Sequence, residues 1–544
     1  MTRKSPMRFF GLVIVLAMLA PVLGIAWLTL SPSEIPNNAN DGLMSFLMTT
    51  VLPYQFGQTL GLMLGVTGLT LLAGVPAAWF VTFIDFPGRK QLQWLLLLPL
   101  AMPTYIAAYV FAEFLDKAGP FYQFWISIFG ATAWYPSLNS LGGAIFTLSA
   151  VLYPYVYMSA RTGFINQSAE LMQAGRVLGA SQWMSFRQIA LPLSRPMIIV
   201  GVALALMECL NDIGAVEHLG VKTLTVGVYE TWLSRGSLEG AARIAMLLLG
   251  LMALLLLVER YLRAGGIEQK SKNDLTPILH KPTPLMQGAI LAMTSLPFLI
   301  GFVIPVLLLI SFALGRFENT YGLLAAASRS ILLASATAFI VVTIGLFLAF
   351  LTRINPPGLL SKSIQTASLG YAIPGTVLGL GVLIVLSQFD NATSGFFKGA
   401  IIPILSGSVF ALIFAYSLRF LSISFGTFEA ELSRVPHTID MAASSLGAKT
   451  FQLLRFVHMP MLRPALITAS VLVFVDTMKE LPATLILRPF NFETLATQVY
   501  NYASVGQIED AAIPALVIVT IGILPVYIAT RKFHPENSIG LSSA

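Results

Sequence analysis

The chain has 544 residues, of which 56% are hydrophobic and 10% are charged, and its mean hydropathy is +0.79. A soluble globule of this size needs more polar surface than that, so the composition places the chain in a lipid bilayer. The net charge of +7 does not indicate a nucleic-acid partner, because the basic residues flank apolar segments. One cysteine, Cys209, excludes an intrachain disulfide, and no clustered Cys/His spacing offers a metal site.

Apolar segments of about 20 residues, the length that crosses a hydrocarbon core of ~30 Å, recur along the chain. We therefore expect an all-α polytopic membrane protein in which two tandem six-helix repeats, at residues 1–265 and 287–544, are joined by a cytoplasmic linker at 266–286. The twelve expected spans are 9–30, 58–84, 92–115, 141–160, 196–216, 243–262, 288–314, 329–352, 363–387, 399–420, 464–486 and 511–530.

The basic residues fall on one side of these spans. Since Lys and Arg mark cytoplasmic loops, both termini are expected in the cytoplasm. Residues 1–30 could instead be a cleaved secretory peptide, but their apolar run is longer than a signal core and has no clear cleavage site. The basic residues that set the orientation are Arg3, Lys4, Arg8, Arg89, Lys90, those from Arg161 to Arg195, Arg263, Lys270, Lys272, Lys281, Arg353, Lys362, those from Arg419 to Arg463, Arg531 and Lys532.

The two halves repeat each other in sequence. At an offset near 270, Pro87-Gly88 aligns with Pro357-Gly358. The most polar segments, residues 173–196 and 441–464, agree at a fixed offset of 268. The matches there are Ala174 with Ala442, Leu178-Gly179-Ala180 with Leu446-Gly447-Ala448, Arg187 with Arg455, Pro192 with Pro460, and Arg195-Pro196 with Arg463-Pro464.

Each copy of this segment is a short run of helix formers, a glycine, and a second amphipathic run that ends at proline. A helix, a glycine bend and a helix make a compact knob between two membrane helices. An ordinary surface loop is the alternative, but ordinary loops diverge between duplicated halves. Retention of the pattern in both copies indicates that both dock onto equivalent surfaces of a twofold partner.

These segments resemble the EAA loop of binding-protein-dependent ABC importer permeases, in which Gly is followed after nine residues by Ile-x-Leu-Pro. Gly179, Ile189 and Pro192 fit that spacing. The glutamate position is Gln173 or Met441, with Glu170 and Asp440 nearby. The resemblance implies that each loop inserts a coupling helix into a partner ATPase, through Gln173, Ala174, Gly175, Gly179, Ile189, Pro192, Ala442, Ala443, Gly447, Val457 and Pro460.

Two further stretches, residues 211–229 and 479–500, look like the fused iron(III) permeases of Gram-negative bacteria. That resemblance covers most of the chain. It implies an inner-membrane subunit that works with an ABC ATPase dimer and a periplasmic binding protein, and it implies ferric iron as cargo. Related permeases carry thiamine, phosphonates or oxyanions, and these remain open because a shared scaffold does not fix the substrate.

Four acidic residues within the predicted spans are candidates for the translocation path: Glu208, Asp212, Asp476 and Glu480. Ionisable residues in a membrane are costly and commonly functional. The members of each pair are four residues apart and share a helix face, and both pairs lie at equal distances from Pro196 and Pro464. A negative entrance would favour a cation. Alternatively, the acids lie at helix ends in the headgroup region and pair with Lys479 or Lys222.

The energy supply is expected outside the chain. Residues 220–223 (GVKT) and 447–450 (GAKT) lack the glycine before lysine of a phosphate-binding loop, so ATP and Mg²⁺ are expected on a partner. No nucleophile and base are arranged for catalysis, which predicts a transport subunit rather than an enzyme. An ion-coupled secondary transporter is the competitor from another class, but it predicts inverted repeats. A membrane-embedded enzyme would need intramembrane catalytic groups, which the sequence does not offer.

Overall fold

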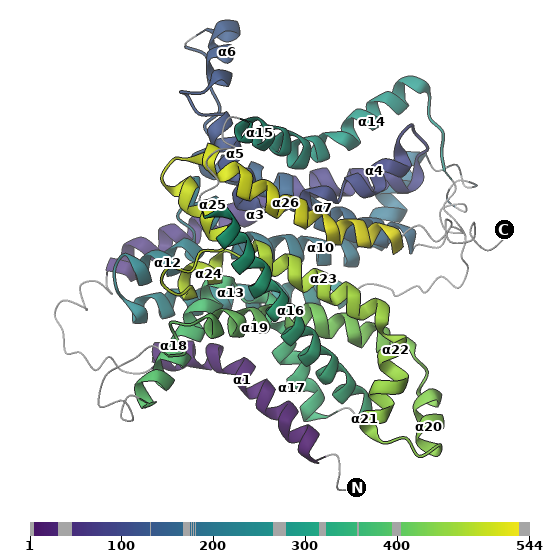
Figure 1. Cartoon of the computed structure of the whole chain (residues 1–544). Helices are drawn as coiled ribbons and strands as arrows, with labels where there is room; N and C mark the ends of the chain where they lie inside the picture. The colour runs from purple at the N-terminus through teal and green to yellow at the C-terminus, as the bar shows by residue number, and fades with distance from the viewer. Residues whose placement is uncertain are drawn as a thin grey trace.

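The computed structural model describes residues 5–30, 46–130, 132–166, 175, 177, 179, 181–264, 279–314, 322–355, 358–393 and 404–532. These residues form a helical bundle (Figure 1). Ten helices are long and apolar enough to cross a membrane, or up to twelve if each of two bent helix pairs counts as one span. The prediction of an all-α polytopic membrane protein is confirmed.

The first half of the chain supplies the elements up to α13. They are α1 (Ser5–Leu30), η2 (Leu47–Val51), α3 (Leu52–Phe83), α4 (Arg89–Leu95), η3 (Leu98–Ala101), α5 (Thr104–Phe114), α6 (Pro120–Phe129), α7 (Leu141–Ile165), α9 (Gln182–Ser185), η4 (Phe186–Ala190), α10 (Leu191–Asn211), α11 (Gly214–His218), α12 (Leu224–Leu233) and α13 (Leu238–Ala264).

The second half follows the same succession of long and short helices. Its elements are α14 (Pro284–Phe298), η5 (Leu299–Val303), α15 (Ile304–Ala313), α16 (Leu323–Ile354), α17 (Leu359–Ala367), η6 (Ser368–Ala372), α18 (Gly375–Thr393), α19 (Val409–Arg434), α20 (His437–Ser445), α21 (Thr450–Gln452), η8 (Leu453–His458), α22 (Met459–Met461), α23 (Arg463–Lys479), α24 (Pro482–Leu487), α25 (Leu495–Ser504) and α26 (Ile508–Lys532). Most of the predicted linker, from residue 266 to residue 278, lies outside the described residues.

Five of the expected spans differ markedly from the helices that form. Two of them are 196–216, where α10 ends at Asn211, and 363–387, which is divided among α17, η6 and α18. The expected span at 92–115 is broken, with a bend of 88° between Arg89–Ala101 and α5, because Pro103 stands before α5 and has no N–H to continue a helix. The expected span at 464–486 ends at Lys479, where Glu480 adopts an extended backbone. The expected span at 399–420 is wrong by more than one turn, because the helix is α19 at Val409–Arg434.

The first helix of each half packs against the other half. α1 lies along α18 and α13, and the carbonyl oxygen of Pro21 in α1 faces Gly381 of α18, where an added Cβ would lie 2.7 Å from it. α14 and α15 pack in turn against α3, α4, α5 and α26, on the opposite edge of the bundle (Figure 1). The two halves are therefore interlocked at both edges rather than joined along one flat face.

Within the first half, the most extensive helix pair is α3 with α7. Gly74 of α3 lies against the backbone of α7, where an added Cβ would stand 2.9 Å from the Tyr157 nitrogen and 3.1 Å from the Tyr153 carbonyl oxygen. Gly68 of the same helix has no atom within 4 Å of an added Cβ. Small residues allow this backbone approach, which drives helix association in lipid.

We expect Gly74→Val to separate α3 from α7 and to lower stability by about 1–3 kcal/mol, the usual cost of overpacking. Gly68→Val is the matched control, because it places the same side chain on the same helix where space is open. The measurement is the thermal stability and membrane abundance of each purified variant. Equal stability of the two variants would contradict the close packing at Gly74.

Candidate functional site

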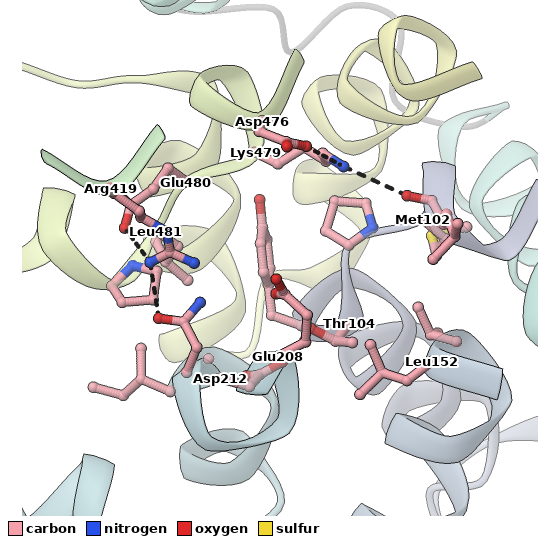
Figure 2. A pocket seen from close by; sticks show the side chains of 18 of the residues that line it. Met102, Thr104, Leu152, Glu208, Asp212, Arg419, Asp476, Lys479, Glu480 and Leu481 are labelled. Atoms are coloured by element: carbon pink, nitrogen blue, oxygen red, sulfur yellow. Dashed lines mark hydrogen bonds and ion pairs between the residues drawn. The ribbon is translucent and has the colours of Figure 1, made fainter. Parts of the chain in front are cut away.

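A cavity of about 120 Å³ lies between the two halves. Its lining comes from the helices around α10 in the first half and α23 in the second (Figure 2). The lining residues are Leu100, Met102, Pro103, Thr104, Tyr105, Val151, Leu152, Tyr155, Glu208, Asn211, Asp212, Ile213, Gly214, Tyr371, Arg419, Phe420, Asp476, Lys479, Glu480, Leu481 and Pro482. All four acidic residues predicted from the sequence are among them.

The lining follows the internal repeat. At the offset of 268, most lining residues of the first half have a partner that also lines the cavity. The pairs are Val151 with Arg419, Leu152 with Phe420, Glu208 with Asp476, Asn211 with Lys479, Asp212 with Glu480, Ile213 with Leu481, and Gly214 with Pro482. The cavity is therefore lined by equivalent sequence positions of the two halves.

Asp212 and Glu480 end α10 and α23 and cap the short helices that follow. Both side chains are buried, with 7% and 5% of their surface exposed. Asp212 accepts the Ala215 N–H at 2.8 Å and the Thr104 hydroxyl. Glu480 accepts the N–H groups of Ala483 at 2.9 Å and Thr484 at 3.1 Å. These bonds satisfy N–H groups at the first turns of α11 and α24.

Glu208 and Asp476, the other two acids, stand one turn earlier on α10 and α23. Glu208 accepts a hydrogen bond from the Tyr371 hydroxyl, which comes from the other half. Asp476 forms an ion pair with Lys479 at 3.1 Å, and each of these two side chains is about a quarter exposed. Neither acid caps a helix with the bonds described for Asp212 and Glu480. Their carboxylates have fewer bonding partners than those of Asp212 and Glu480.

Sequence reasoning missed Arg419, which it grouped with the basic residues of a cytoplasmic loop. That placement is wrong, because Arg419 lies within α19 and only 5% of its surface is exposed. Its Nη1 donates to Asn211 Oδ1 at 2.8 Å and lies 3.4 Å from Glu480 Oε1. The signal in the sequence was the repeat itself, since Arg419 aligns with Val151 inside a predicted span of the first half.

The cations of the cavity are distributed unequally between the halves. Arg419 and Lys479 both come from the second half, where the first half has Val151 and Asn211. Each cation pairs with an acid of its own half, Glu480 or Asp476. The Lys479 ammonium also lies 3.5 Å from the Leu100 carbonyl oxygen. Glu208 and Asp212 of the first half instead accept hydrogen bonds from hydroxyl groups, so the negative charge is concentrated on that half.

The headgroup alternative predicted Lys479 or Lys222 as partners of these acids. Lys479 does pair with Asp476, but Lys222 pairs with Glu230 and is not part of the cavity lining. Within the described ranges, no group of three or more His, Cys, Asp or Glu side chains is arranged to hold a metal ion. The cavity is lined by four acidic and two basic side chains.

The second repeated loop, at α20, α21 and α22, lies at one end of the bundle, here called the loop end, away from α12 and α25 (Figure 1). In the second loop, α20 is followed by Gly447 and then by α21, as a helix, a bend and a helix. Gly179 and Gly447 both have φ of +83°. This left-handed conformation favours glycine. Gln173 and Ala174 of the predicted coupling set lie outside the described residues.

Both loops expose apolar side chains. In the first loop, Val177 is 87% exposed and Trp183 is 66% exposed. In the second, Leu446 is 89% exposed and Phe456 is 68% exposed. The predicted coupling residues Ala442 and Pro460 are exposed as well, whereas Ile189 and Val457 are half-buried. The two loops therefore share exposed apolar side chains at their surface.

An ion-pair cluster fixes the second loop to the bundle. The Arg353 guanidinium, near the end of α16, lies 2.7 Å from Asp440 of α20 and donates to the Val435 carbonyl oxygen at 3.0 Å. His458 Nε2 lies 3.0 Å from the same aspartate without a hydrogen bond to it. Asp440 is the residue that the sequence offered in place of the missing glutamate, and its ion pair with Arg353 ties α20 to α16.

Residues 74–264 match the sequence model of the family described as "binding-protein-dependent transport system inner membrane component". The Fe(3+)-transport system permease protein FbpB 2 of Haemophilus influenzae is 24% identical over 480 residues, which cover 87% of this chain and 88% of that protein.

Two other relatives match parts of the chain. The molybdenum transport system permease protein ModB of Escherichia coli is 30% identical over 215 residues, 38% of this chain and 92% of that protein. The sulfate transport system permease protein CysT of Escherichia coli is 33% identical over 143 residues, 26% of this chain and 50% of that protein. All three relatives are named as transport permeases rather than enzymes.

We expect Glu480→Gln to reduce stability by about 3 kcal/mol, because it leaves the buried Arg419 without its charged partner. Asp476→Asn should cost about 1 kcal/mol or less, since its ion pair with Lys479 is partly exposed. Thermal unfolding of the two purified variants in the same detergent compares them. Equal melting temperatures would contradict a structural role for the Arg419–Glu480 pair.

Proposed function

Because the chain belongs to the family of binding-protein-dependent transport system inner membrane components, we propose that it is the permease subunit of an ATP-binding-cassette importer. In this proposal it resides in a bacterial inner membrane and forms the path for a solute that a periplasmic binding protein delivers. The observation that carries the proposal is the charged cavity lined by equivalent positions of the two halves, with paired loops in the same bundle.

The paired loops are the proposed docking sites for an ABC ATPase dimer, which binds ATP and Mg²⁺. Two equivalent loops suit a partner with twofold symmetry, and their exposed apolar side chains suit burial in a groove. The loop end is then cytoplasmic, with both chain termini on that side. The ion-coupled secondary transporter gives these loops no role, and no relative named above supports it.

We propose ferric iron as the cargo. The iron permease of Haemophilus influenzae aligns with most of this chain, whereas the molybdenum and sulfate permeases align with less than half of it. The cavity has four acidic and two basic side chains, so carboxylates exceed cations. In a poorly solvated passage such an excess attracts a cation and repels an oxyanion.

An oxyanion such as molybdate is the second candidate, and a specific observation favours it. Arg419 and Lys479 line the same cavity, and guanidinium and ammonium groups bind oxyanions. Both cations, however, are already engaged by Glu480 and Asp476. Thiamine is also a cation and phosphonates are also oxyanions, so each shares the charge argument of one of these two candidates.

The loops can be tested through their glycines. Neither Gly179 nor Gly447 has an atom within 4 Å of an added Cβ, so a substitution there strains the backbone without a clash. A β-branched residue at a positive φ costs of order 1–3 kcal/mol per site. We expect the Gly179→Val, Gly447→Val double variant to insert in the membrane but to lose ATPase co-purification and uptake.

Gly426→Val is the control for this double variant. Gly426 also has open surroundings, but it lies within α19 and not among the glycines of positive φ. It should retain the ATPase and transport normally. Normal co-purification of the ATPase with the double variant would contradict the docking role of the loops.

The cargo can be tested through the two acids with fewer bonding partners. We expect Glu208→Gln with Asp476→Asn to lower iron uptake severalfold at unchanged abundance, because charges in a poorly solvated passage interact by several kcal/mol and exposed ones by about 1 or less. The assay is uptake of radiolabelled ferric iron into cells that express the importer with its binding protein. Molybdate uptake is measured in parallel.

Glu239→Gln is the matched control, because Glu239 pairs with Arg243 on α13 and does not line the cavity. It should leave uptake at the parental level. Parental iron uptake in the double variant would exclude the two acids from the path. If the parental protein takes up molybdate, and the double variant takes it up at the same or a higher rate, the cargo is an oxyanion.

A further inference from the structure

We propose that the segment from Pro120 to Tyr135, here called the interface anchor, lies in the headgroup region of the bilayer and holds the bundle there. It comprises α6 and the turn that follows it. Its exposed side chains contact phospholipid, in the membrane leaflet on the side opposite the loop end. This role is separate from the cavity and from the docking loops, so it stands or falls apart from the transport function.

The composition of the segment differs from that of an aqueous loop. Seven of the 23 residues from Ala118 to Ser140 are Phe, Tyr or Trp. No Asp, Glu, Lys or Arg occurs between Lys117 and Arg161. Tyr and Trp are enriched at membrane–water interfaces, where an apolar ring and a polar tip are both accommodated. The aligned connection in the second half contains Asp390 and Lys398, so this composition belongs to one half.

The connectivity places the anchor at the level of the membrane surface. It joins α5 to α7, and α7 leads into the first loop from its other end. The 25 residues of α7 extend about 37 Å at 1.5 Å per residue, a little more than a hydrocarbon core of ~30 Å. With its C-terminus at the loop end, α7 begins close to the opposite boundary of the hydrocarbon, and the anchor immediately precedes it.

The direction of α6 suits a helix that lies in the membrane plane. Figure 1 shows α6 pointing away from the bundle, at a steep angle to α15 and α26. A connecting helix in contact with water alone could point outward, parallel to the membrane-spanning helices. α6 instead extends sideways, beyond the edge of the bundle, over the area that lipid occupies.

Some side chains of the anchor are packed and others are exposed. The Phe121 ring lies 4.8 Å from Phe114 of α5, and Tyr122 lies 4.9 Å from Tyr135, measured between ring centroids. These contacts hold α6 to the end of α5 and to the returning chain. The exposed apolar side chains, here called the outer face, are Phe124, Ile128 and Phe129, with exposed fractions of 59%, 56% and 58%, and Trp134, with 78%.

The outer face continues the lipid-facing surface of the spans. α5, from which the anchor extends, packs against α15. Leu307 of α15 is 60% exposed, and Leu314, the residue that follows this helix, is 69% exposed. A helix with aromatic and aliphatic side chains on one face, at the edge of a membrane bundle, buries that face at the headgroup–acyl boundary. Continuity with the spans therefore favours lipid over a protein partner.

The test measures the surroundings of a spin label on the anchor. In a Cys209→Ala background, Ile128→Cys is labelled with a nitroxide, and the full-length chain is reconstituted in phosphatidylethanolamine–phosphatidylglycerol vesicles. Leu307→Cys is the lipid reference, and Ser234→Cys, exposed in the turn after α12, is the water reference. Collision rates with oxygen, which enters lipid, and with a nickel chelate, which stays in water, are then compared.

We expect the label at position 128 to resemble that at 307, with the oxygen rate severalfold above the nickel rate. A label at 128 that matches the one at 234 would overturn the proposal. The proposal would also be overturned if the label at 128 were shielded from the nickel chelate only after the purified binding protein is added. That result would make α6 a docking element. If Ile128→Cys inserts poorly, Phe124→Cys on the same face provides the same measurement.

Discussion

Polar side chains at equivalent positions of the two halves are the constraint on which the structure depends. Duplicated helices bring Asp212 and Glu480 together at a depth where water is scarce, so each carboxylate needs partners. The chain supplies them by stopping α10 and α23 there and starting α11 and α24, whose first N–H groups bind the carboxylates. Arg419 completes the arrangement from the second half and also holds Asn211 of the first.

Much of this architecture could be predicted from the sequence. The apolar segments indicated the spans, the repeat indicated the two loops, and equal spacing from Pro196 and Pro464 indicated that four acids would meet. These patterns are local or periodic, and the hydrophobic effect acts on them directly. The positive φ of Gly447 likewise follows from a glycine that breaks two helical runs.

The features that could not be predicted from the sequence depend on tertiary contacts, which a hydropathy pattern does not contain. An arginine inside a span is unfavourable by itself, and Arg419 is stable there because Glu480 faces it from another helix. The bend before α5 follows from Pro103, but its angle is set by the helices that pack around it. Whether Asp212 caps a helix or faces a solute also depended on where the backbone of α10 ended.

Because the two halves belong to one polypeptide, the residues at their equivalent cavity positions can differ. In a pair of identical subunits, any arginine at the position of Arg419 would occur twice, as would any lysine at the position of Lys479. Four cations would then oppose four carboxylates, and no net charge would remain for a solute. A single polypeptide escapes this symmetry, because Val151 and Asn211 can occupy the equivalent positions. In a single polypeptide the charge of the cavity can thus change one residue at a time.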